Sequence, residues 1–71
     1  MNRNLFTPPP VVLKDLPSGI RGFVCLGSDY EPVIVLNSAL SREQQRATYR
    51  HEMEHILRGE VWNENYHEYC G

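Results

Sequence analysis

The sequence predicts a small α+β domain in which a three-stranded antiparallel sheet packs on one long helix, followed by a short C-terminal segment or helix. Two observations support this fold class. The first half of the chain contains three short apolar runs separated by turn residues, and the second half contains a long stretch without proline or glycine. A chain of 71 residues can bury one small core. We therefore expect residues 1–71 to form a single domain.

The predicted strands follow an N-terminal arm. Residues 1–10 end in three consecutive prolines, which restrict φ and lack N–H donors, so this arm should be extended. The runs IRGFVCLGS (residues 20–28) and VIVLN (residues 33–37) are joined by the turn segment SDYEP. They predict an antiparallel hairpin with Gly22 as a possible bulge. The apolar run Val11 to Leu13 is a plausible third strand.

The predicted helix spans Arg42 to Arg58. Ser41 followed by Gln44 is a capping-box pattern at its start, and Gly59 supplies the usual stop at its end. The apolar residues expected to face the sheet are Ala47, Met53, Ile56 and Leu57.

Composition disfavours several classes of protein. The net charge is −2 and the basic residues are scattered, which disfavours nucleic-acid binding. No apolar run is long enough for a membrane span or for the central region of a signal peptide. We therefore expect a cytoplasmic location and no membrane association.

Two histidines on the predicted helix, His51 and His55, stand four residues apart, with Glu52 directly after the first. Positions i and i+4 lie only about 40° apart on a helix, so both imidazoles can reach one point, and Glu52 shares their sector. This spacing is typical of a site in which two histidines hold zinc and the glutamate acts as general base on an activated water. The competing interpretation is a solvated helix face with pairs such as Arg50 with Glu54.

The VIVLN run followed by a capped helix bearing YRHEMEHIL resembles the ImmA/IrrE-type zinc metallopeptidases, many of which are encoded in phages and mobile elements. The resemblance implies zinc ligation by His51 and His55 and a general base at Glu52. It also implies a third ligand, which in this family is a glutamate on a later helix. Only a short segment follows the motif in this sequence, so any such ligand lies within it. Glu60 follows the helix stop at Gly59 directly and lies only five residues after His55. Its side chain would have to turn back over a very short stretch of chain to reach the same metal. Of the remaining candidates we select Glu68, with His67 and Glu64 as alternatives.

The predicted function is zinc-dependent hydrolysis of peptide bonds in a peptide or regulatory protein, with Glu52 catalytic. The substrate would lie extended beside an edge strand, plausibly the VIVLN run. A homo-oligomer is possible. The alternative is a non-catalytic, metal-stapled or metal-free interaction or regulatory module of a mobile element. The small size favours this module, whereas Glu52 favours the enzyme because a structural zinc site needs no base.

Overall fold

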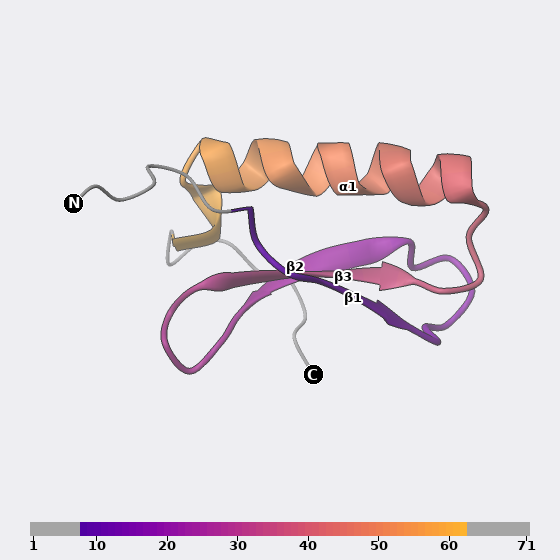
Figure 1. The fold of residues 1–71 in the computed structure, drawn as a ribbon, viewed down its shortest axis with the longest axis horizontal. Coiled ribbons are helices and arrows are strands. Elements are labelled where there is room, and N and C mark those ends of the chain that lie inside the picture. The colour runs from indigo at the N-terminus through magenta and orange to yellow at the C-terminus, as the bar shows by residue number, and fades with distance from the viewer. Residues whose placement is uncertain (1–7, 63–71) are drawn as a thin grey trace.

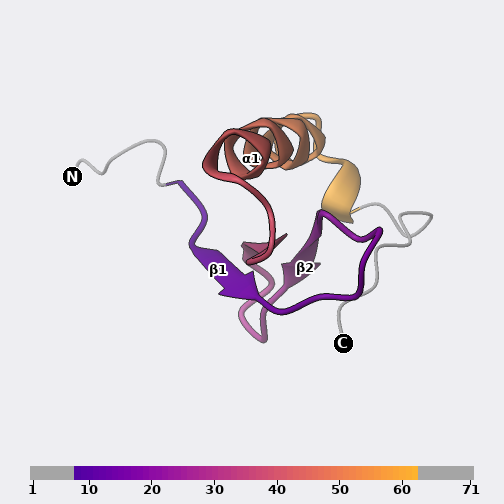
Figure 2. The ribbon, with the colours of Figure 1, turned by 90° about the vertical axis from the view of Figure 1, so that its right-hand side faces the viewer.

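The computed structural model of this chain describes residues 8–62. Its strands are β1 (Val11–Lys14), β2 (Gly22–Leu26) and β3 (Pro32–Asn37), followed by the helix α1 (Arg42–Leu57) and a short 3-10 helix, η1 (Glu60–Trp62). Helix α1 lies over one face of the sheet (Figure 1), and the end-on view in Figure 2 shows the same two layers. The predicted α+β class, with three strands and one long helix, is confirmed for the described residues.

The sheet is mixed, so the predicted fully antiparallel arrangement is wrong. Its strand order is β1-β3-β2, with β2 antiparallel and β1 parallel to β3. The chain reverses between β1 and β2 and again between β2 and β3, so the first and third strands run the same way. Strand β3, which contains the VIVLN run, is therefore central and offers no free edge to a substrate.

The connection between β1 and β2 is held by the buried side chain of Asn37, which is 4% exposed. Its Nδ2 donates hydrogen bonds to the carbonyl oxygens of Leu16, at 3.3 Å, and Ile20, at 2.8 Å. Its backbone N–H donates to the Arg21 carbonyl at 2.8 Å. A buried amide with satisfied hydrogen bonds fixes an otherwise irregular loop. Arg21, at the end of this loop, is thereby placed at the start of β2.

The predicted bulge at Gly22 is wrong, because the pairing of β2 with β3 is continuous from Gly22 opposite Leu36 to Leu26 opposite Pro32. Gly22 instead allows close packing. A Cβ atom at Gly22 would lie 2.6 Å from the Val35 carbonyl oxygen and 3.1 Å from Cγ2 of Thr48 on α1. Only a residue without a side chain lets the backbone and the helix approach this closely.

The predicted helix ends are confirmed. The Ser41 hydroxyl accepts a hydrogen bond from the Gln44 N–H at 3.1 Å, and the Gln44 side chain accepts one from the Ser41 N–H at 3.0 Å. Gly59 has a φ of 75°, the left-handed conformation that ends many helices. This conformation turns the chain back, so that η1 follows directly beneath the end of α1 (Figure 1).

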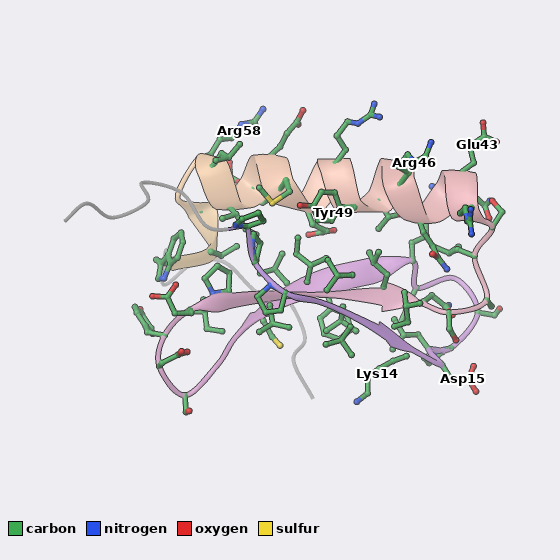
Figure 3. The ribbon with its side chains drawn as sticks, viewed as in Figure 1. Lys14, Asp15, Glu43, Arg46, Tyr49 and Arg58 are labelled. Carbon is green, nitrogen blue, oxygen red and sulfur yellow. The ribbon has the colours of Figure 1, made fainter. Side chains whose placement is uncertain are left out.

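The helix is rotated relative to the predicted inner stripe. Its buried residues are Thr48, Glu52 and Ile56, whereas Leu57 is 68% exposed and Ala47 is also exposed. The close approach at Gly22 brings the Thr48 side of the helix to the sheet, and the Thr48 hydroxyl is satisfied by the Gln44 carbonyl at 2.8 Å. The charged side chains of Glu43, Arg46 and Arg58 point away from the sheet (Figure 3).

The apolar core lies between α1 and the sheet. It consists of Val24, Ile34, Leu36, Ile56 and Val61, with Leu26, Tyr49 and Met53 packed against it. Val61 brings η1 into this core, and the indole N–H of Trp62 donates to the Tyr30 carbonyl at 3.1 Å. Within residues 8–62, no helix has the length and apolar composition needed to cross a bilayer.

Candidate metal centre

His51 and His55 converge on the surface of α1 as their spacing predicts. Their Nε2 atoms lie 3.3 Å apart, and the two rings are 4.8 Å apart, centroid to centroid, in an edge-to-face arrangement. Both residues belong to a regular part of the helix, so one turn separates them. The two Nε2 atoms are therefore within hydrogen-bond distance of each other, with the donor set by the tautomers of the two rings.

The distance between these nitrogens fits a shared zinc ion. Two imidazole ligands at a Zn–N distance of about 2.05 Å and a tetrahedral angle would place their nitrogens roughly 3.3–3.4 Å apart. The Nε2 atoms already stand at this separation. The pair needs little rearrangement of the helix to supply two of the protein ligands of a zinc site.

His55 has a partner on the other side of its ring. Its Nδ1 lies 2.5 Å from Oε1 of Glu60, and Arg58 Nη1 lies 3.7 Å from Oε2 of the same carboxylate. The hydrogen bond from His55 lowers the pKa of the Glu60 carboxyl, with further lowering by the charges of His55 and Arg58 and an opposing effect of burial. An ionised carboxylate only accepts hydrogen bonds, so the proton of this contact resides on Nδ1 of His55.

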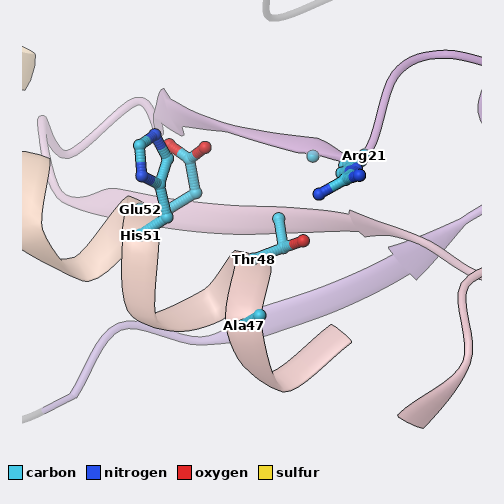
Figure 4. A pocket seen from close by; sticks show the side chains of 6 residues that line it. Arg21, Ala47, Thr48, His51 and Glu52 are labelled. Atoms are coloured by element: carbon cyan, nitrogen blue, oxygen red, sulfur yellow. The ribbon is translucent and has the colours of Figure 1, made fainter. Parts of the chain in front are cut away.

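Glu52 lies on the sheet side of the helix, where it is only 5% exposed. It lines a pocket of about 310 Å³ together with His51, Ala47 and Thr48 from α1 and with Arg21 and Gly22 from the start of β2. Figure 4 shows Arg21 across the pocket from the neighbouring side chains of His51 and Glu52. Burying a carboxylate is costly, which makes Glu52 a candidate functional residue of this pocket.

The competing interpretation of the motif is a solvated helix face with charged pairs, and the outer surface of α1 has one such pair. Glu54 lies 4.0 Å from Arg58, and both side chains are 63% exposed. Exposed pairs of this kind contribute little to stability. Part of the helix is therefore a solvated face, as that interpretation expects, but Glu52 is not on it.

The structure brings His51 and His55 together through their Nε2 atoms and places Glu52 beside His51 on the pocket wall, whereas His55 does not line that pocket. Glu68, the predicted third ligand, and its alternatives Glu64 and His67 lie outside the described residues. Within residues 8–62, no group of three or more His, Cys, Asp or Glu side chains is arranged to hold a metal ion.

Sequence reasoning missed the Glu60 contact with His55 and the position of Arg21 on the pocket wall. A glycine stop followed at once by a glutamate, five residues after a histidine, is the signal that could have revealed the first. No local sequence pattern predicts that Arg21 lies on the pocket wall. Comparisons of this chain with protein-family models, with curated proteins and with solved structures found no match.

Proposed function

We propose that this chain is a zinc-dependent metallopeptidase that hydrolyses peptide bonds in a peptide or protein. The observation that carries the proposal is the 3.3 Å separation of the His51 and His55 Nε2 atoms beside the buried carboxylate of Glu52. The likeness of the motif to ImmA/IrrE-type metallopeptidases supports the same assignment.

Each residue has a distinct role in this proposal. His51 and His55 hold the metal through Nε2. Zinc, when bound, supplies a Lewis acid that lowers the pKa of a water molecule to roughly 7. Glu52 accepts the proton of the attacking water and delivers it to the leaving amine, since its carboxylate borders the same pocket as His51.

The substrate is proposed to pair with β2, because β3 is central and the pocket opens at the first residue of β2. The Asn37 N–H donates a hydrogen bond to the Arg21 carbonyl, so these two residues form a hydrogen-bonded pair of the antiparallel ladder. Hydrogen-bonded and non-hydrogen-bonded pairs alternate along such a ladder. The backbone N–H and C=O groups of Gly22, Val24 and Leu26 therefore point away from β3. Val24 is only 2% exposed, so an extended peptide is proposed to pair at the start of this edge, at Gly22, with one side chain entering the pocket.

Zinc binding is the first test. We expect one zinc ion per chain, and zinc at about 100 times its Kd should raise the free energy of unfolding by about 2.7 kcal/mol. In a domain of this size that corresponds to an increase in Tm of about 10–20 °C. Isothermal titration calorimetry and thermal unfolding measure both quantities.

The matched variants are His51→Ala and Arg50→Ala. The first removes a ligand and should weaken zinc binding on the order of 10²-fold or more, since even outer contacts to a ligand contribute 10-fold to 100-fold. The second removes an exposed neighbour on the same helix and should leave the affinity unchanged. Equal zinc affinity in His51→Ala and wild type would exclude the proposed metal centre.

The third ligand is tested by alanine variants of the downstream residues. Glu68→Ala should weaken zinc binding severely, whereas Glu64→Ala and His67→Ala should leave it nearly intact, as the resemblance to the peptidase family implies. Zinc titration of the three variants side by side measures the difference. Release of the metal by His67→Ala alone would indicate a three-histidine site and would weaken the family assignment.

The second candidate function is a metal-stapled interaction or regulatory module without turnover. A pocket of about 310 Å³ lies at the lower end of ligand-binding pockets, which favours this candidate. Zinc binding by the wild-type protein with no cleavage of any member of a diverse peptide library would select the module over the enzyme.

A further inference from the structure

Glu60 is held in place by the structure around it. Gly59, with its φ of 75°, turns the chain back under α1, and Val61, 6% exposed, anchors η1 in the core. Trp62 at the end of η1 bonds to the Tyr30 carbonyl in the β2–β3 turn. The 2.5 Å contact between Glu60 Oε1 and His55 Nδ1 therefore joins two elements that are each fixed independently.

This contact determines which nitrogen of His55 is available to a ligand. A neutral imidazole carries one N–H, and the Glu60 carboxylate requires that proton on Nδ1. Nε2 is then left with its lone pair, and it is Nε2 that lies 3.3 Å from Nε2 of His51. Arg58, 3.7 Å from the second oxygen of Glu60, helps to hold the carboxylate in its orientation.

We propose that Glu60 is a positioning residue of the metal centre, which orients the His55 ring and selects the Nδ1–H tautomer of the neutral ring, so that the lone pair of Nε2 is directed at the metal. The inference rests on the proposed zinc site and adds to it an outer carboxylate that no part of the motif contains. A carboxylate accepting from the far nitrogen of a histidine ligand also fixes the orientation of that ring. Glu60 is not a ligand itself, because it contacts the opposite side of the ring from Nε2.

The experiment compares Glu60→Ala and Glu60→Gln with Glu54→Gln, which alters an exposed glutamate on α1, the helix that carries His55. Zinc affinity is measured by competition with a chromophoric chelator. The tautomer of His55 in the metal-free protein is measured by long-range ¹H–¹⁵N NMR. We expect Glu60→Ala to lose 10-fold to 100-fold in zinc affinity and to lose the Nδ1–H tautomer. Glu60→Gln should lose less, because its amide oxygen still accepts from Nδ1, and Glu54→Gln should match wild type.

The outcomes separate this inference from the proposed function. If wild type binds zinc and Glu60→Ala binds it as tightly as Glu54→Gln does, the inference is wrong and the metal centre stands. If His55 of metal-free wild type carries its proton on Nε2, the inference is likewise wrong. If wild type binds no zinc, the proposed function fails, and a normal Nδ1–H tautomer in that protein would show that the contact serves only the fold.

Discussion

Replacing Glu52 with glutamine is expected to leave zinc binding and the fold intact while reducing peptide hydrolysis by a factor on the order of 10² or more. Glutamine keeps the size of the side chain in its buried position and leaves both histidines unchanged, but it cannot accept the proton of the attacking water. Turnover of a cleaved peptide, zinc stoichiometry and circular dichroism of the variant together measure the effect.

Glu54→Gln is the matched control for this variant, because it removes a carboxylate from the exposed side of the same helix. It should retain wild-type turnover. If Glu52→Gln and wild type hydrolyse the same peptide equally fast, Glu52 is not the base. If both glutamine variants lose activity to the same extent, the loss reflects the charge of the helix and not a role specific to Glu52.

Ile56→Ala is expected to lower the free energy of unfolding by about 2–5 kcal/mol, whereas Leu57→Ala should change it by roughly 0.5 kcal/mol or less. Ile56 is 7% exposed and belongs to the core, but its neighbour Leu57 is 68% exposed. The two substitutions remove the same number of carbon atoms from adjacent positions of one helix. Their difference therefore reports the rotation of α1 that buries Glu52.

Urea denaturation of the metal-free proteins measures both changes. A domain of this size has only about 3–5 kcal/mol of stability from its core, so Ile56→Ala should be largely unfolded without zinc. Addition of zinc should restore part of the folded population if the metal binds the native state alone. Equal destabilisation by the two variants would mean that the helix faces the sheet along the apolar stripe predicted from the sequence, which consists of Ala47, Met53, Ile56 and Leu57.

Interactions close in sequence made the helix and the hairpin predictable. The capping box between Ser41 and Gln44 and the left-handed Gly59 are local features, and both appear where the sequence placed them. The β2–β3 hairpin likewise follows from two apolar runs and one short turn. The parallel pairing of β1 with β3 involves residues more than twenty positions apart, so the apolar run at Val11 could not indicate its direction.

The sequence by itself determined the convergence of His51 and His55, because helix geometry brings residues four apart onto one face whatever surrounds them. Tertiary structure decided the rest of the candidate site. The close approach of the helix to Gly22 places Glu52 on the sheet side, where it lines the pocket with Arg21. From the sequence alone, a charged residue next to apolar ones is expected to be exposed. The turn at Gly59 and the anchoring of Val61 bring Glu60 to the far side of the His55 ring. These placements depend on packing between elements, which local spacing does not encode.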